Sequence, residues 1–351
     1  MNRYSGVKKV QIPSQAQLKR RPFPYVLCSV CVFCIWLIWN SLTPTLPKLS
    51  DPPKLYSNPS REDLRLTILS SIKKAKSSVF LCMFGLSDPS ILKGLSDKIR
   101  QHVPVAIYYD TQGSPDVRKM LQGAEIHPVN LSGIMHQKIL ILDEEMVFLG
   151  STNFTTQSLK MHDNLVIGLS SQKVARFLKE KVPHASGYLR CLVGGQDVEL
   201  WLLPDLKGHA LTDLKKKIRT ATKSLRIALF TLTHNVLIEE IIQAKKRGVD
   251  VTVLLDMHSS LGASSSAVKT LQKEGVRVVC SQGVQLMHHK FVYIDERTLV
   301  TGSANWTKAA FSKNSDCLLV LHNLSPTQRT FMNRLWHNIE TATQTPAKKP
   351  S

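Results

Sequence analysis

The stretch that decides the fold is MHQKILILD at residues 135–143, which is followed by GSTN at residues 150–153. A second copy reads MHHKFVYID at residues 287–295, and GSAN follows it at residues 302–305. In both copies the glycine lies 14 positions after the histidine. One His-x-Lys-x4-Asp pattern is weak evidence. Two copies in the same order, each with its own Gly-Ser-x-Asn, indicate a duplicated unit.

Each copy has the pattern of a β-hairpin. The apolar runs at residues 139–142 and 291–294 predict short buried strands that end in turns. On such a strand the histidine and the lysine leave the same face, about 7 Å apart, so an imidazole and an ammonium project into one space. Asp143 and Asp295 have an odd spacing from their histidines, which predicts a supporting role at the turn rather than contact with the imidazole.

The repeat extends outward from the motifs. Elements before the motifs match at an offset of 146 residues and the motifs themselves at 152, and we assign the difference to a Ser- and Gly-rich loop at residues 259–266. Strands and helices alternate through both halves, which predicts an α/β sandwich with a largely parallel or mixed sheet in each half. The matched strands are 79–84 with 225–230, and 103–110 with 249–256; both members of the second pair end in aspartate.

The N-terminal region differs in composition from the repeat. Residues 23–39 carry no charge and are dominated by apolar side chains, and basic residues precede them. This length is near the lower limit for a membrane-spanning helix, and no small-residue cleavage pattern follows, so we favour an uncleaved signal anchor over a cleaved signal peptide. The basic flank places the N-terminus in the cytoplasm and the catalytic part on the non-cytoplasmic side, or outside the cell if the segment is cleaved.

These patterns divide the chain into seven expected parts. Prolines among Ser, Thr and Lys indicate an extended tether after the anchor. The parts are a basic tail at 1–22, a transmembrane signal anchor at 23–40, the tether at 41–60, a first half at 61–170, a linker at 171–193, a second half at 194–341 and a disordered tail at 342–351.

The chain is strongly basic, with a net charge of +20. Residues 1–60 hold eight basic and one acidic side chain, so +13 of this charge belongs to the rest of the chain. Such an excess suits an anionic partner, either a phospholipid membrane surface or a nucleic acid, and charge alone does not choose between them. No Cys-x2-Cys pair occurs after the anchor, which argues against a structural zinc site. The disulfide state of Cys82, Cys191, Cys280 and Cys317 stays open.

With two His-x-Lys-x4-Asp motifs and two Gly-Ser-x-Asn motifs, the chain resembles the phospholipase D superfamily over residues 61–340. The resemblance implies a pseudo-twofold fold in which both motifs meet in one cleft. It also implies phosphodiester chemistry through a phosphohistidine intermediate, without a metal or another cofactor.

The chemistry explains the residue types. A neutral imidazole can attack an anionic phosphodiester, and a second, protonated imidazole can give a proton to the leaving alkoxide and then activate water. The resemblance implies that His136 is the nucleophile and His288 the acid. Ammonium, amide and hydroxyl groups are expected around the phosphate, where preorganised donors stabilise the transition state. These groups belong to Lys138, Lys290, Asn153, Asn305, Ser151 and Ser303.

The family also places a carboxylate downstream of each histidine to orient the ring. Asp316 lies 28 positions after His288, but the position 28 after His136 is Asn164. An amide oxygen can accept from the ring N–H, yet it lacks the charge that stabilises an imidazolium. The first half is therefore expected to be the weaker partner.

Three neighbours of the motifs are also of interest. We expect His289 to face substrate or the surface, and Phe154 and Trp306 either to flank the cleft or to pack in the core.

The sequence favours a membrane-anchored phosphodiesterase of the phospholipase D type that cleaves a phospholipid head group. A nuclease of the same superfamily is the main alternative, and a phosphatidyl transferase such as a cardiolipin synthase is a variant of the first. A catalytically idle binding module is disfavoured because both histidines and both lysines are present. The oligomeric state stays open.

Overall fold

The computed structural model describes residues 28–34, 44–60, 62–114, 116–282 and 285–344. The chain forms two compact units, residues 1–43 and 44–351. In the first unit residues 28–34 are helical, with Cys28, Cys31 and Cys34 exposed. The rest of the predicted anchor lies outside the described residues. Across the described ranges, no helix is both long and apolar enough to span a membrane.

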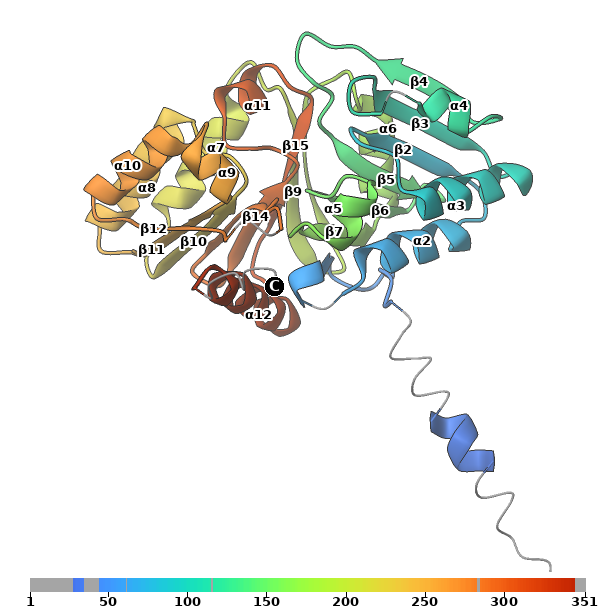
Figure 1. Cartoon of the computed structure of the whole chain (residues 1–351), viewed down its shortest axis with the longest axis horizontal. Helices are drawn as coiled ribbons and strands as arrows, with labels where there is room; N and C mark the ends of the chain where they lie inside the picture. The colour runs from blue at the N-terminus through green and yellow to red at the C-terminus, as the bar shows by residue number, and fades with distance from the viewer. Residues whose placement is uncertain (1–27, 35–43, 61, 115, 283–284, 345–351) are drawn as a thin grey trace, which may run out of the picture. The chain divides into compact units, whose positions relative to one another are not determined.

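The second unit contains two mixed β-sheets (Figure 1). The first has the order β1-β7-β6-β5-β2-β3-β4. Strands β2, β3 and β4 are parallel to one another, and the other neighbours are antiparallel. The strands are β1 (Lys54–Tyr56), β2 (Val79–Met83), β3 (Val105–Asp110), β4 (Glu125–Val129), β5 (Lys138–Leu142), β6 (Met146–Gly150) and β7 (Val166–Ser170).

The second sheet repeats this arrangement. Its order is β12-β11-β10-β13-β14-β15-β9-β8, with β10, β11 and β12 parallel. The prediction of two α/β halves is therefore confirmed. The strands are β8 (Gly187–Val193), β9 (Gln196–Leu203), β10 (Ser224–Leu229), β11 (Asp250–Leu255), β12 (Arg277–Cys280), β13 (Lys290–Ile294), β14 (Thr298–Gly302) and β15 (Asp316–Leu321).

Helices connect the strands in a matching order. In the first half they are α2 (Leu64–Lys74), α3 (Pro89–Arg100), α4 (Val117–Met120), α5 (Thr156–Lys160) and α6 (Gln172–Lys181). In the second half they are α7 (His209–Arg219), α8 (Asn235–Lys246), α9 (Met257–Leu261), α10 (Ser265–Lys273), α11 (Lys308–Ser312) and α12 (Pro326–Gln344).

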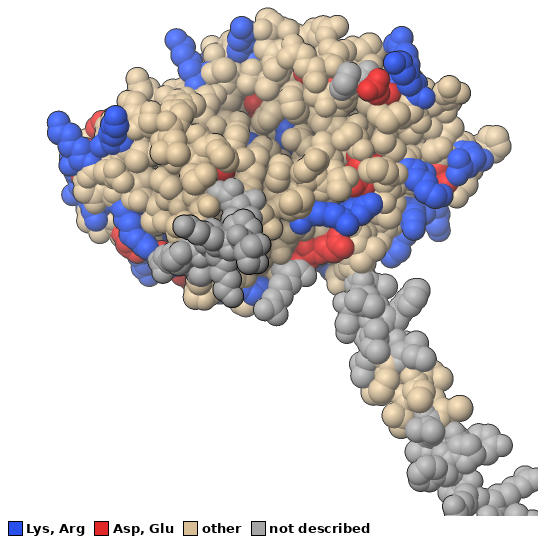
Figure 2. Space-filling view, in the orientation of Figure 1, with Lys and Arg blue, Asp and Glu red and all other residues tan. Residues whose placement is uncertain are grey.

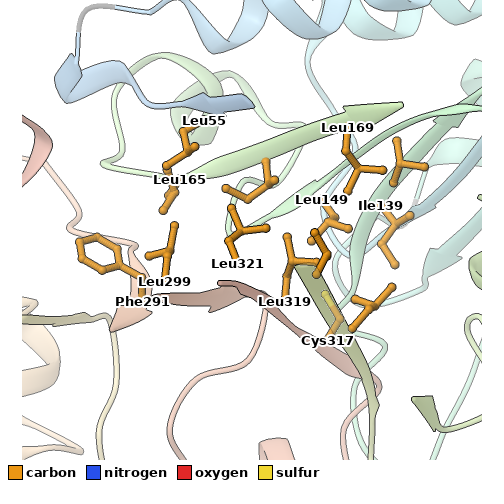
Figure 3. Close-up of a cluster of buried hydrophobic side chains, with 14 of the residues drawn as sticks. Leu55, Ile139, Leu149, Leu165, Leu169, Phe291, Leu299, Cys317, Leu319 and Leu321 are labelled. Atoms are coloured by element: carbon orange, nitrogen blue, oxygen red, sulfur yellow. The ribbon is translucent and has the colours of Figure 1, made fainter. Parts of the chain in front are cut away.

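The central strands are buried on both faces. In β5, Ile139 and Ile141 belong to a hydrophobic cluster shared by the two sheets, whereas Leu140 and Leu142 belong to a cluster under the helices of the first half. Successive side chains of a strand point to opposite faces, so a continuous apolar run covers both sides of the sheet. Figure 3 shows the shared cluster, in which side chains from both sheets meet. This cluster holds the two halves together, and it includes Met135 and Met287, which directly precede the two motif histidines.

Several boundaries differ from the sequence-based expectation. The expected tether contains β1, which extends the first sheet, and a short 3-10 helix, Asn58–Ser60. The expected linker forms α6 and β8, and β8 extends the second sheet. Residues 259–266 are not one loop, because α9 ends and α10 begins there. Helix α12 continues to residue 344, and residues 345–351 of the expected tail lie outside the described ranges.

Candidate active site

The segments that carry the two histidines cross from one half to the other. The His136 backbone N–H donates to the Ser315 carbonyl (2.8 Å), and the His288 backbone N–H donates to the Asp163 carbonyl (2.9 Å). Ser315 and Asp163 each directly precede a residue that was expected to orient a ring. The backbone pairing therefore delivers each orienting side chain to the histidine of the other half.

The side chains of the histidines and of the orienting residues also make contacts between the two halves. His136 Nδ1 lies 2.8 Å from Asp316 Oδ1, and His288 Nδ1 lies 3.0 Å from Asn164 Oδ1. The expectation that each half orients its own histidine is wrong, because the pairing is reciprocal between halves. The histidine with a neutral partner is therefore His288, and His136 has the carboxylate.

Asn164 fixes the protonation pattern of His288. Its amide nitrogen donates to the Ser158 carbonyl (2.8 Å), and also lies near Ser158 Oγ (3.2 Å) and the His162 carbonyl (3.4 Å). The amide oxygen is consequently turned towards the ring and must accept from Nδ1–H. In the neutral ring, Nε2 then has a free lone pair on the side away from Asn164.

The two motif serines hold the orienting residues. Ser151 Oγ donates to Asn164 Oδ1 (2.8 Å), and Ser303 Oγ donates to Asp316 Oδ1 (2.7 Å). Both serines are fully buried. The expectation that they bind the phosphate is wrong, because each hydroxyl proton is already engaged behind the histidine.

The two motif lysines are buried next to their histidines. Lys138 Nζ donates to the His136 carbonyl (2.7 Å), and Lys290 Nζ donates to the His288 carbonyl (3.1 Å). One backbone acceptor leaves an ammonium with further donors to offer. Each lysine can therefore stay anchored while it donates to an anionic ligand.

A phenylalanine in each half supports the histidine and the lysine together. The Phe84 ring centroid lies 5.4 Å from that of His136 and 5.2 Å from Lys138 Nζ. Phe230 makes the same two contacts in the second half, both at 5.1 Å. Neither phenylalanine belongs to the repeated histidine motifs. Their signal was the match of Phe84 with Phe230 at the ends of the repeated strands.

Burial and neighbouring lysines disfavour a positive charge on either histidine. The pKa of His136 is lowered, mainly by burial and also by the nearby Lys138. Asp316 acts in the opposite direction and raises the pKa. Burial, then Lys290 and Lys138, lower the pKa of His288 well below its usual 6.5. His136 also contributes to this shift, so the two rings lie within electrostatic reach of one another.

The lysines respond in the same way. Burial lowers the pKa of Lys138 to about 8, against the opposing effect of Asp316. Burial and the neighbouring Lys138 lower the pKa of Lys290 well below its usual value. Cations gathered in a buried site are stabilised by an entering anion, so this arrangement suits a phosphate.

Two aspartates outside the motifs position the motif segments. Asp110 Oδ2 accepts from the Met135 backbone N–H (3.0 Å), and Asp256 Oδ2 accepts from the Met287 N–H (3.2 Å). Their second oxygens cap the turns that follow β3 and β11. The repeated aspartate at the end of each predicted strand was the available signal for this role.

The motif aspartates lie at the other end of the strand from the lysines. Asp143 accepts backbone N–H groups at distances from 2.7 to 3.1 Å, and Asp295 does so at 2.8 to 2.9 Å. Both therefore fix the hairpin turn against the strand before it. The donors belong to Lys76, Ser77 and Ser78 for Asp143, and to Thr222, Lys223 and Ser224 for Asp295.

The motif asparagines retain hydrogen-bonding capacity. The side-chain oxygens of Asn153 and Asn305 are buried, and no described residue donates to them. The backbone N–H of Asn153 donates to Ser158 Oγ (3.0 Å), which fixes the residue in place. Both amides are thus available to a ligand in the site.

Other neighbours of the motifs are structural. His289 is fully buried, and its ring centroid lies 5.3 Å from that of Phe291 on the inner face of β13. Its expected place facing substrate or the surface is wrong, because strand alternation turns it away from His288. Phe154 and Trp306 are 3% and 2% exposed and pack in the core.

Within the described ranges, no three His, Cys, Asp or Glu side chains are grouped so that they could hold a metal ion. The cysteines in these ranges are free thiols, of which Cys82 and Cys317 are buried.

Known proteins resemble this chain in sequence. A mouse protein named mitochondrial cardiolipin hydrolase is 30% identical over 134 residues, which are 37% of this chain and 60% of that protein. A phospholipase D from Rickettsia bellii is 30% identical over 107 residues, 30% of this chain and 53% of its own length. The chain thus spans little more than half the length of these relatives.

A solved structure shows the same fold over most of the chain. Phosphatidylserine synthase from Haemophilus influenzae superposes with a TM-score of 0.63 at 14% identity, covering 86% of this chain and 89% of that one. The family described as "Cardiolipin synthase, PLD-like domain" matches residues 68–184 and 214–339. These two matches cover both halves and both histidine motifs, and the chain belongs to this family, within the phospholipase D superfamily.

Proposed function

We propose that the protein hydrolyses a phosphodiester by double displacement at the site shared by His136 and His288. One observation carries the proposal: two buried imidazoles each have Nδ1 tied to an acceptor from the opposite half, and a buried lysine accompanies each ring. Fixing Nδ1 leaves both Nε2 atoms for chemistry. Two rings with this arrangement are what a nucleophile and an acid–base group require.

The partner of each ring assigns its role. In the intermediate, the nucleophilic ring carries the phosphoryl group on Nε2 and a proton on Nδ1, and is therefore cationic. Asp316 lies 2.8 Å from His136 Nδ1 and would stabilise this cation, whereas Asn164 offers His288 no charge. His136 is accordingly the nucleophile. His288, whose imidazolium is poorly stabilised, is the stronger acid of the two.

Two steps complete the reaction. In the first, His136 Nε2 bonds to phosphorus while the bond to the leaving oxygen breaks, and His288 gives that oxygen a proton. In the second, water attacks phosphorus, His288 takes a proton from this water, and the bond between phosphorus and nitrogen breaks. Both rings return to their starting protonation states, so the two displacements balance.

The remaining polar groups bind the phosphate. Lys138 and Lys290 keep free donors while each is anchored to a backbone carbonyl, and the side-chain N–H groups of Asn153 and Asn305 would donate to the phosphate oxygens. Donors held in place before charge develops contribute on the order of 2–4 kcal/mol each to transition-state stabilisation.

A phospholipid head group is the substrate that we favour. The support is the names of the relatives, cardiolipin hydrolase and phospholipase D, together with a basic chain that suits an anionic lipid surface. On the face in Figure 2, lysine and arginine side chains stand in separate places rather than in one continuous track. A single-stranded nucleic acid would follow such a track more readily than scattered charges.

The N-terminal segment would keep the site near its substrate. Residues 23–39 are free of charge and follow a basic stretch, so we propose a single-pass anchor with a cytoplasmic N-terminus and the catalytic unit on the other side. Glycosylation sites engineered before and after the segment would test this topology. Modification only on the N-terminal side would overturn it.

One assay tests both the substrate class and the site. The full-length protein in detergent micelles is incubated with cardiolipin, phosphatidylcholine, single-stranded DNA and single-stranded RNA, each with a chelator present. Head-group release from lipid is expected. Added alcohol acceptors would distinguish hydrolysis from phosphatidyl transfer. Nucleic-acid cleavage without lipid turnover would instead favour the nuclease.

The variants His136→Asn and His288→Asn serve as the test of the site. Each removes one of two coupled functions, so turnover should fall by about 10²–10⁴-fold or more in both. Full activity in either variant would contradict a shared site.

A further inference from the structure

A third imidazole lies beside His288. The ring centroid of His162 is 6.4 Å from that of His288, and the ring planes are inclined by 53°. His162 is half-buried, whereas His288 is only 7% exposed. One water molecule can bridge two imidazoles at this separation. His162 is thus the more accessible member of a pair of neighbouring rings.

The backbone holds His162 in this place. Its N–H donates to the Gln157 carbonyl (3.0 Å), and its carbonyl accepts from the Asn164 amide (3.4 Å). The same Asn164 orients His288 through its amide oxygen (3.0 Å). Asn164 therefore contacts both the backbone of His162 and the ring of His288.

The opposite side of the site lacks this feature. The position equivalent to His162 in the second half is Asn314, whose side-chain oxygen accepts from the Ile134 N–H (3.3 Å). Among the described residues, the aromatic ring that contacts His136 is that of Phe84. The extra imidazole therefore stands on the side where the orienting residue carries no charge.

His288 has a difficulty that His162 can resolve. As the acid it must be protonated when substrate is bound, yet burial and two lysines disfavour its imidazolium. The proton must arrive once the anionic phosphate has entered. At that point the substrate covers a ring that was already almost inaccessible.

The charges around His162 are compatible with proton exchange. Burial lowers the pKa of His162, Asp256 opposes this effect, and Lys290 adds to it. His288 also lies within electrostatic reach, because His162 contributes to the lowered pKa of His288.

We propose that His162 delivers to His288 the proton that the leaving group will receive. The inference rests on the proposed double displacement. A ring nitrogen of His162 passes a proton through one water to Nε2 of His288 as the phosphodiester binds, and His162 regains a proton from solvent. After the second displacement, the proton that His288 has taken from water returns to solvent by the same route, so each turnover balances. No bond to phosphorus involves His162, which acts only through His288.

The leaving group provides a selective test. A poor leaving group such as choline needs the proton, whereas p-nitrophenolate leaves without one. The substrates are phosphatidylcholine and phosphatidyl-p-nitrophenol, or a thymidine dinucleotide and thymidine 5′-p-nitrophenyl phosphate if the wild type cleaves nucleic acid. General acid catalysis contributes about 10²–10⁴-fold, so His162→Asn should lower kcat roughly tenfold or more for the first substrate of each pair. For the nitrophenyl substrate, kcat should change by less than about twofold.

Two further measurements separate this role from a structural one. Added imidazole should restore the activity of His162→Asn on the poor leaving group. His234→Asn is the matched control, because His234 is another half-buried imidazole, packed against Phe311, and the variant should leave the ratio between the two substrates unchanged.

The outcomes are distinguishable. Equal losses on both substrates, or a rise in KM alone, would overturn the relay and assign His162 to packing or substrate binding. Unchanged kcat on both substrates would also overturn it while the proposed function stands. A wild-type protein that cleaves none of these substrates would refute the proposed function, and the relay with it.

Discussion

Asn164 and Asp316 occupy equivalent positions, yet one is neutral and the other carries a charge. The difference decides how each histidine behaves, because the partner of a ring N–H sets how well the ring holds a positive charge. His136 gains the carboxylate, and His288 gains only an amide. The pair is thus chemically asymmetric although the fold around it is nearly symmetric.

This asymmetry predicts the pH dependence of kcat/KM. His136 must be neutral and His288 protonated, and both pKa values are lowered from the usual 6.5. Because His288 is the stronger acid, the productive combination of a neutral His136 and a protonated His288 is most populated between the two lowered pKa values. Activity should therefore be highest on the acidic side of pH 6.5 and fall at both lower and higher pH. Deprotonation of Lys138, with a pKa of about 8, would reduce activity further.

The variant Asn164→Asp tests the assignment. A carboxylate beside Nδ1 should raise the pKa of His288 by roughly 1–3 units and so enlarge the fraction of molecules in which His136 is neutral and His288 is protonated. The acidic limb, which the lower pKa of His288 sets, should move up, and the maximal kcat/KM should rise. A shift of this limb without a rise in kcat/KM would mean that the roles of the two rings are reversed.

At the residue level, the sequence predicted which residues form the site. It did not predict which histidine each orienting residue contacts. Strand alternation predicted that each histidine and its lysine share a face, and both lysines lie beside their histidines. A spacing of 28 residues could not tell whether Asn164 serves His136 or His288. Nor could it show that Ser151 and Ser303 point behind the rings, since a hydroxyl is equally able to bind phosphate.

At the level of elements, the Gly-Ser-x-Asn motif depends on close backbone approach. A Cβ at Gly150 would lie 2.2 Å from the Leu165 carbonyl oxygen, and one at Gly302 would lie 2.2 Å from the Cys317 carbonyl oxygen. Only glycine lets the end of each hairpin strand lie this close to its neighbour. The following serine is thereby brought within reach of the orienting residue.

Gly302→Ala tests this requirement. The backbone of Cys317 would have to shift, so the free energy of unfolding should fall by about 1–3 kcal/mol or more, measured by urea denaturation. Activity per folded molecule should also fall, because Ser303 would move relative to Asp316. Gly248→Ala is the control. A Cβ there meets no atom, so it should cost only about 1 kcal/mol from its left-handed backbone and leave activity unchanged.

The elements themselves were predictable to different degrees. The hairpins and the repeated helices and strands carry strong periodicity, and β4 lies at the predicted residues 125–129. Strand β1 has only three residues beside prolines, so it resembles the tether that precedes it. Polar serines at 259–266 indicate a loop, yet Asp256 caps α9 through its side chain and starts a helix there.

At the scale of the whole molecule, neither half has a complete site. Each sheet supplies a histidine, a lysine and the residue that orients the ring of the other sheet. The hydrophobic cluster between the sheets draws on both, with Ile139 and Leu149 from one and Phe291 and Leu319 from the other (Figure 3). The packing of the two halves against each other therefore also assembles the catalytic site. A repeat in the sequence predicts that the two halves pair. It does not predict that each half orients the histidine of the other.

The central claim is that one phosphate is handled by two rings with different tasks. The most direct measurement is mass spectrometry of the full-length protein after rapid quenching during turnover of phosphatidyl-p-nitrophenol. In His288→Asn, the first displacement needs no acid with this leaving group, and the second lacks its base. His136 carrying the phosphatidyl group should therefore accumulate in His288→Asn, and His136→Asn should give no adduct. A phosphoryl group on His288, or steady turnover in His288→Asn without any adduct, would contradict the account.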